Sequence, residues 1–440
     1  MAGLQFDTYW QYVFAISIGA AVVGVALIML VGYARCITIA TGAMLAIGAY
    51  GATVPVVHLG MPFLPALVIA TLLGALAGLL LGIAGVRFRS HNLAMVTLVF
   101  QAVVIIVLRE SKELTGGAEG INVPPPVIFG QSFAGDAVFL IMSGVLYALV
   151  VLPISVLLFG PFGKNLRALA SNENAARAFG IDVRHHLIAG FIWSSALIAF
   201  AGAVLAPRFH VIDPDSYGVL TSIFALAYPI IGGMGSIWGG LVGGGVLRAM
   251  PELLRPVADY IELIFCVLVV GTLTFFPDGL ISALLKWPRR KPVAAAEVLS
   301  TGGKSERELI AQLLSATETL GDGGAHRVEP CLTLPVLEIR GVSKSFGALR
   351  AVQDVSLKVA AHALHGLMGP NGAGKTTLFN MVSGFIPPDK GNILLMGQPL
   401  ENIPLEKRVT FGMARTFQHA SLFPQLSCLD NVLIGLGRNT

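Results

Sequence analysis

Long apolar stretches without charge dominate the first 285 residues of the chain. Residues 36–86, 137–163, 187–207 and 216–247 contain no Asp, Glu, Lys or Arg. Uncharged apolar stretches of about 18 residues or more are typical of membrane-spanning helices. The pattern predicts a polytopic α-helical membrane domain of about 8–9 helices. Its nine candidate crossings are 12–34, 36–57, 62–85, 92–108, 137–160, 187–207, 218–235, 237–250 and 261–283.

The seventh and eighth crossings are joined by the glycine-rich stretch "IIGGMGSIWGGLVGGG", residues 230–245. It is compatible with a tight hairpin or a re-entrant segment. Glycine also lets membrane helices approach closely, and plain helix packing is the favoured interpretation of these glycines.

Basic residues predict the orientation of the membrane domain. Cytoplasmic loops carry an excess of Lys and Arg. If the N-terminus lies outside, eleven basic residues fall inside and four fall outside. The chain from residue 286 onward is then cytoplasmic, and Tyr9, Trp10 and Tyr12 form an aromatic anchor at the outer surface.

Two polar segments interrupt the apolar pattern. Residues 109–126 fall outside, and residues 163–186, "GKNLRALASNENAARAFGIDVRHH", fall inside. The second is predicted to be helical, with apolar positions at Leu166, Ala170, Ala175 and Phe179. Such a helix can rest on lipid headgroups or dock a cytoplasmic partner. Composition alone leaves both alternatives open.

The character of the sequence changes after residue 286. We expect a transmembrane domain at 1–286, a cytoplasmic linker at 287–335 and a third, nucleotide-binding domain at 336–440. In the linker, Ser305 and Glu308 form a capping box that predicts one short helix. Strands are predicted at 336–347 and 353–369 from their β-branched and aliphatic residues.

The second predicted strand leads into "GPNGAGKTT", followed by the helical stretch "TLFNMVSG". The motif fits GxxxxGK[ST] in its required context of strand, loop and helix. Its glycines let backbone N–H groups surround phosphate oxygens, and the following helix adds its positive end. Lys375 can reach the β- and γ-phosphates, and the Thr376 hydroxyl can ligate Mg²⁺. The predicted nucleotide-binding residues are Gly369, Pro370, Asn371, Gly372, Ala373, Gly374, Lys375, Thr376 and Thr377.

The motif and its surroundings, including "GFIPPDKGNILLMGQPL" and "MARTFQHASLFPQLSCLDNV", resemble the ATP-binding subunits of ABC transporters. The nearest type is the LivG type of the branched-chain amino-acid importers. The resemblance implies ATP and Mg²⁺ as cofactors. It also implies that Phe346 stacks on adenine and that Gln418 contacts Mg²⁺ and the attacking water in a completed site.

The resemblance covers about 336–440, as the N-terminal fragment of such a subunit. Residues 419–440 contain no LSGGQ-like signature, Walker-B pair or switch histidine. Phosphoryl transfer depends on positioning by such groups. We therefore expect the 440-residue chain to bind ATP weakly and not to hydrolyse it alone.

The membrane part resembles the LivM-type permease of the same importers over roughly 15–285. The resemblance is carried, in order, by "VRFRSHNLAMVTLVF", "TGGAEGINVPPP", "FGKNLRALASNENAARAFGIDV", "IIGGMGSIWGGLVGG" and "FFPDGLI". It favours docking to an ATPase as the role of 163–186. The sequence departs from the family at Arg35, where a glycine is usual, and at Thr38 and Ala40, where a serine and a glycine are usual.

Charge and cysteine content argue against a nucleic-acid-binding protein, a disulfide-rich protein and a zinc protein. A net charge of +4 gives no nucleic-acid footprint, and four dispersed cysteines without a CxxC pair indicate neither a disulfide framework nor a zinc site.

The resemblance implies a fused subunit of an ATP-driven importer in the bacterial inner membrane. The substrates expected are branched-chain amino acids, or urea, amides or aromatic acids. The expected partners are a second permease, a second ATP-binding subunit and a periplasmic binding protein. A channel or ion-coupled carrier with a regulatory phosphate loop is the alternative from another class. The scarcity of charge in the spans argues against it.

Overall fold

The computed structural model describes residues 8–88, 91–128, 130–133, 135–255, 260–276, 279, 335–401, 403–417 and 422–435. Its contacts divide the chain into two compact units. The first comprises Met1–Leu285 together with Thr416–Thr440, and the second comprises Lys286–Arg415. The predicted linker helix lies outside the described residues.

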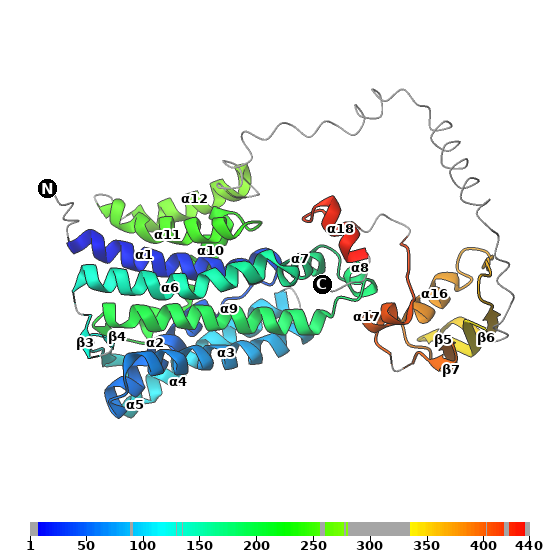
Figure 1. Cartoon of the computed structure of the whole chain (residues 1–440), viewed down its shortest axis with the longest axis horizontal. Helices are drawn as coiled ribbons and strands as arrows, with labels where there is room; N and C mark the ends of the chain where they lie inside the picture. Colours follow the sequence, from blue (N-terminus) through cyan, green and yellow to red (C-terminus); the bar gives the residue numbers. More distant parts are fainter. Residues whose placement is uncertain are drawn as a thin grey trace, which may run out of the picture. The chain divides into compact units, whose positions relative to one another are not determined.

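Helices build the first unit (Figure 1), and each of the nine predicted crossings corresponds to a described helix. Six of these helices are long and apolar enough to cross a membrane, which confirms the predicted fold class. They are α1 (Thr8–Leu27, continued by the π-helical η1, Ile28–Tyr33), α2 (Thr41–Leu59), α3 (Phe63–Arg87), α4 (His91–Glu110), α6 (Asp136–Phe159) and α9 (Val183–Leu205). The shorter three are α10 (Val219–Gly232), α11 (Ile237–Leu253) and α12 (Ile261–Phe275).

The glycine-rich stretch forms the turn between α10 and α11 and part of α11 itself. The predicted close packing is confirmed by α11, whose glycines lie against α1. A Cβ on Gly240 would stand 2.4 Å from the Gly24 carbonyl oxygen, and one on Gly244 would stand 2.2 Å from the Ala20 oxygen. Within the hairpin, a Cβ on Gly232 would meet the Gly239 oxygen at 1.8 Å. Only residues without a side chain allow backbones this close.

The segments predicted to lie outside meet one another. They contain α5 (Lys112–Thr115), η2 (Gly117–Glu119), the strand pair β2 (Val127–Ile128) and β3 (Gln131–Ser132), η3 (Ala206–Arg208) and η4 (Asp215–Tyr217). Strand β1 (Ile121–Asn122) pairs antiparallel with β4 (Val211–Ile212). Ion pairs join Arg109 to Asp215 and Arg208 to Asp136. The loops that the charge pattern predicts on the outer side therefore lie together, as the predicted alternation in helix direction requires. The side of the membrane that these loops face stays a prediction.

The connection between α1 and α2 departs from the predicted crossing at 36–57, because α2 begins only at Thr41. Arg35 has φ of 51°, in the left-handed region where glycine is favoured. The first N–H groups of α2 are satisfied by side chains of other helices. Gly42 donates to Ser222 Oγ at 2.8 Å, and Ala43 donates to Gln101 Oε1 at 2.6 Å. These cross-helix bonds, and not the local sequence, fix where α2 starts.

The predicted helix at 163–186 is divided in the structure into α7 (Pro161–Ser171), α8 (Glu173–Ala178) and the first turn of α9. Asn172 is extended and its side chain accepts a hydrogen bond from the Ala175 N–H at 3.0 Å. It therefore acts as the N-cap that starts a second helix. The prediction of one helix is wrong because asparagine competes with the helical backbone for hydrogen bonds.

The second unit contains an antiparallel sheet in the order β6-β5-β7-β8. Its strands are β5 (Leu337–Phe346), β6 (Leu349–Val359), β7 (Lys390–Leu395) and β8 (Gln398–Pro399). Helix α16 (Lys375–Ser383) buries Leu378 and Met381 in the same core as Ile339 and Ile393. Helices α17 (Leu405–Arg408) and η6 (Val409–Phe411) follow the sheet.

The strand predicted at 353–369 is found only as far as Val359, in β6. No residue of 363–369 pairs with a strand in the described part of the chain. Leu364 and Met368 are almost fully exposed there. A strand needs a hydrogen-bonded neighbour, and this apolar stretch has none among the described residues. The prediction was wrong for residues 360–369 because local composition does not report the presence of a partner strand.

Candidate functional site

The phosphate loop at 369–374 is built from glycines with unusual backbone angles. Gly369, Gly372 and Gly374 have φ of 159°, 86° and 79°. Gly374 is also the residue before α16, and no side chain caps the N-terminus of that helix. Among the described residues, no side chain accepts a hydrogen bond from the first N–H groups of α16, which suits an anion site at a helix N-terminus.

Gly374 is fixed by a close approach to the sheet. A Cβ at this position would lie 2.1 Å from the Ala351 carbonyl oxygen of β6. Gly372 has open space around it. The loop is thus anchored to the sheet at one glycine and free at the other.

Lys375 closes the loop from the helix side. Its Nζ donates to the carbonyl oxygens of Gly369 and Pro370, both at 2.6 Å. The ammonium therefore lies over the loop that the sequence assigns to phosphates. Asn371, Ala373, Thr376 and Thr377 belong to the same loop and first helical turn. The residues present fit a nucleotide phosphate: a lysine cation, glycine backbone N–H groups and a helix N-terminus converge.

The two residues expected to reach the nucleotide from elsewhere differ in what the structure shows. Phe346 lies at the end of β5 with 47% of its surface exposed, outside the buried core of the sheet. Its ring centre is 5.9 Å from Lys344 Nζ. An exposed ring is available for stacking. Gln418 lies outside the described residues.

Two arginines that the sequence analysis did not identify support α16. Arg408 is buried and donates to the carbonyl oxygens of Val382 and Leu400, both at 2.7 Å. Arg415 Nη1 donates to Asn380 Oδ1 of α16 at 2.8 Å. They tie the helix behind the phosphate loop to residues 400–415. The signal in the sequence is weak, because single arginines are common in any solvated segment.

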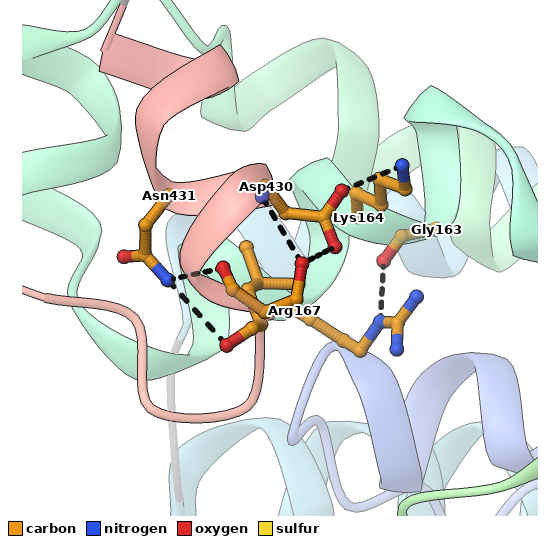
Figure 2. A network of polar contacts seen from close by, with 7 residues as sticks. Gly163, Lys164, Arg167, Asp430 and Asn431 are labelled. Carbon is orange, nitrogen blue, oxygen red and sulfur yellow. Dashed lines mark hydrogen bonds and ion pairs between the residues drawn. The ribbon is translucent and has the colours of Figure 1, made fainter.

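A second candidate surface lies within the first unit, where α7 meets α18 (Cys428–Gly435) and Phe179, directly after α8, meets Phe423, which precedes α18. Asp430 of α18 forms an ion pair with Lys164 of α7, with Nζ and Oδ1 2.7 Å apart (Figure 2). The figure also shows the neighbouring Arg167, whose Nε donates to the Gly163 carbonyl oxygen at 3.2 Å. The guanidinium of Arg167 stacks over the Tyr33 ring at 4.6 Å and so links α7 to the end of α1.

An aromatic contact accompanies the ion pair. Phe423, just before α18, is 1% exposed and meets Phe179 edge-on at a centroid distance of 6.1 Å. It belongs to the main hydrophobic core of the first unit. Asn431 holds the turn around it, because the Phe423 N–H donates to Asn431 Oδ1 at 2.9 Å and Asn431 Nδ2 donates back to the Phe423 oxygen at 3.1 Å.

The Lys164 ammonium, and then the Ser427 hydroxyl, hold the pKa of Asp430 below its usual range by hydrogen bonding to the carboxylate. The segment predicted to dock an ATPase is therefore in contact with residues that follow the phosphate-loop sequence in the same chain. Nothing in the pattern of 420–435 identified Phe423 and Asp430 as contact residues, because their partners are more than 240 residues away.

Comparisons with known proteins follow the same division. Residues 11–276 match the family described as branched-chain amino acid transport system / permease component. Residues 352–439 match the ABC transporter family.

Over 286 residues the chain is 33% identical to the high-affinity branched-chain amino acid transport system permease protein LivM of Escherichia coli (strain K12). This alignment covers 59% of this chain and 67% of LivM. Over 103 residues it is 42% identical to the high-affinity branched-chain amino acid transport ATP-binding protein LivG of the same organism. This second alignment covers 23% of this chain and 40% of LivG. The ATP-binding protein BraF of Pseudomonas aeruginosa is 40% identical over 108 residues, 24% of this chain and 42% of BraF. The chain thus spans about two thirds of the permease relative and about two fifths of the ATP-binding relatives.

Proposed function

Because the chain belongs to the family of branched-chain amino acid transport system permease components, which it matches over residues 11–276, we propose that it is a fused subunit of an ATP-driven importer of branched-chain amino acids. The observation that carries the proposal is the coexistence of a membrane domain and a phosphate loop in one chain. The loop lies at the N-terminus of α16, and Asp430 of α18 pairs with Lys164 of α7. ATP supplies the driving force, and the membrane helices supply the path.

In this proposal the phosphate loop holds ATP. Lys375, whose Nζ donates to the Gly369 and Pro370 carbonyls, would hold the β- and γ-phosphates, and the Thr376 hydroxyl would hold Mg²⁺. Phe346 stacks on the adenine ring. Gln418 contacts Mg²⁺ and the attacking water in a completed site. The segment 336–440 corresponds to the N-terminal part of a LivG-type subunit, after a permease at 1–286 and a linker at 287–335.

The contact of residues 423–430 with α7 and Phe179 is the proposed route from nucleotide to membrane. Closure of two ATP-binding domains moves α18, and the Lys164–Asp430 pair and the Phe179–Phe423 contact pass that movement to α7 and α8. Rigid helices that pack in two discrete arrangements are a common device of such transitions. The membrane domain then alternates its access between the two sides.

The proposed assembly contains a second permease, a second ATP-binding subunit and a periplasmic substrate-binding protein. The N-terminus faces the periplasm and residues 286 onward face the cytoplasm, as the positive-inside pattern predicts.

Uptake by reconstituted vesicles tests the proposal. We expect the chain, assembled with its partner subunits and the binding protein, to accumulate labelled leucine only with ATP inside. Lys375→Ala should abolish this uptake, and Lys390→Ala, on β7 away from the loop, should leave it intact. Leucine uptake that proceeds equally without ATP or without the binding protein would contradict the proposal. Uptake of urea or an aromatic acid in place of leucine would show that the importer carries that class of substrate instead.

A further inference from the structure

A cavity of about 600 Å³ opens within the helices of the first unit. It lies between α1, α2, α9, α10, α11 and α12 and is bounded at one end by residues 209–217. Those residues belong to the segment predicted to lie outside. Its volume is within the range of small-molecule sites.

Most of the cavity wall is apolar. Leu45, Leu205 and Leu247 contribute aliphatic surface, and Phe224 and Phe265 meet edge-on at a centroid distance of 4.6 Å. Such a wall favours an aliphatic group.

Two opposite charges line the same cavity. Arg248 of α11 is half-buried and forms no hydrogen bond or ion pair with any described residue. A cation in a membrane segment is costly and marks a functional site by default. The guanidinium is also the side chain whose fork matches a carboxylate.

Asp213, after β4, supplies the negative charge. Its carboxylate accepts from the Ser216 N–H at 2.9 Å and from the Ser216 hydroxyl at 2.7 Å. Two carboxylate oxygens can accept about four hydrogen bonds, so the group keeps capacity for an ammonium. The nearby Asp215 pairs with Arg109, and Glu252 pairs with Arg255. Neither pair lines the cavity.

We propose that this cavity is a binding site for a zwitterionic amino acid with an aliphatic side chain, with its carboxylate on Arg248, its ammonium on Asp213 and its side chain against Phe224 and Phe265. The site deepens the proposed importer function and rests on it for the substrate class. Both charges also have structural roles available: Asp213 stabilises the turn at Ser216, and Arg248 can extend toward the membrane surface. The experiment separates these roles from binding.

Photolabelling of the full chain in lipid nanodiscs tests the site without requiring transport. The probe is a diazirine analogue of L-leucine, and labelled peptides are identified by mass spectrometry. We expect labelling within 219–253 or 261–275 that excess L-leucine suppresses. L-Leucinamide, which lacks the carboxylate, and 4-methylpentanoate, which lacks the ammonium, should compete at least about tenfold less well.

Matched variants assign each charge. Arg248→Gln should lower L-leucine-competed labelling about tenfold or more and remove the preference for leucine over leucinamide. Asp213→Asn should remove the preference over 4-methylpentanoate. Arg255→Gln and Asp215→Asn remove the same charges beside the cavity and should change nothing. Arg248→Lys keeps the charge without the fork and should fall between wild type and Arg248→Gln, which keeps the test valid if Arg248→Gln is unstable.

The proposed site is refuted if L-leucine does not suppress the labelling or if lipid alone suppresses it. It is also refuted if Arg248→Gln and Arg255→Gln change the labelling equally. ATP-driven leucine uptake by the assembled wild-type transporter is measured separately. Uptake with no labelling in the cavity refutes the site and leaves the proposed function standing. Competed labelling without uptake supports the site and refutes the proposed function.

Discussion

At the scale of single residues, the phosphate loop depends on where a Cβ can be placed. Gly372 and Gly374 share a left-handed backbone, with φ of 86° and 79°. Only Gly374 faces the Ala351 carbonyl at a distance that excludes a side chain. The same residue type in the same motif therefore has two different physical reasons for being glycine.

We expect Gly372→Ala to destabilise the second unit by about 1–2 kcal/mol, the cost of a left-handed alanine. Gly374→Ala should add about 1–3 kcal/mol, because the new methyl group overlaps the Ala351 oxygen. Hydrogen exchange of the α16 amides in the full chain measures both. Equal protection in the two variants would show that Gly374 does not contact β6 as the structure has it.

At the scale of elements, glycine decides how helices cross. Helix α11 lies against α1 because Gly240 and Gly244 have no side chains to separate the backbones. Lipid gives little hydrophobic force between helices, so close contact is what holds them. A methyl group on Gly245, one residue further, would have its nearest neighbouring atom 3.7 Å away, so Gly245 lies beside the contact.

Gly240→Ala should therefore destabilise the membrane domain by about 1–3 kcal/mol through overpacking against Gly24. Gly245→Ala should be neutral or slightly stabilising, because alanine favours a helix more than glycine does. Thermal unfolding in detergent compares the two. The α1–α11 contact is not the one described if Gly245→Ala is the more damaging change.

The contact of α18 with α7 includes the ion pair between Lys164 and Asp430. Lys164→Asp and Asp430→Lys each place like charges together and should loosen α18. The double exchange should restore an attraction of about 0.2–1 kcal/mol, typical of a partly exposed pair. Spin-label distances between α6 and Cys428 of α18 report the docked fraction, with the other cysteines replaced by serine. If the docked fraction of the double variant is no higher than that of either single variant, the ion pair does not contribute to the contact.

At the scale of the whole molecule, the interest of the α18 contact is that it joins the permease helices to sequence that follows the phosphate loop. The pKa of Asp430 is held low in the docked state by Lys164. An acid whose pKa is lower when docked stabilises docking above its undocked pKa and loses that contribution as the pH falls through its docked pKa.

Docking of α18 should consequently be insensitive to pH near neutrality and weaken at pH below about 4, the usual pKa of aspartate. Asp430→Asn should remove this dependence and leave the Phe179–Phe423 contact as the remaining attraction. The same spin-label distances, recorded as a function of pH, provide the measurement. An acid response that persists in Asp430→Asn would assign it to another group.

Periodicity and local chemistry were sufficient for much of this protein. The lengths of the apolar stretches located the nine described helices that match the predicted crossings, since a helix that crosses lipid must satisfy its own backbone and carry apolar side chains along its length. The spacing in "GPNGAGKTT" located the phosphate loop and α16, because the strand–glycine–helix turn is a local structure.

Contacts between distant residues decided the rest. The late start of α2 depends on hydrogen bonds to Gln101 and Ser222, and the α18 contact depends on Lys164 and Phe179. Residues 360–369 form no strand because no described strand lies beside them. The charges of Arg248 and Asp213 come to one cavity only when six helices pack. A sequence determines patterns within a few helical turns, whereas which surfaces meet across the fold is settled by packing that no single stretch encodes.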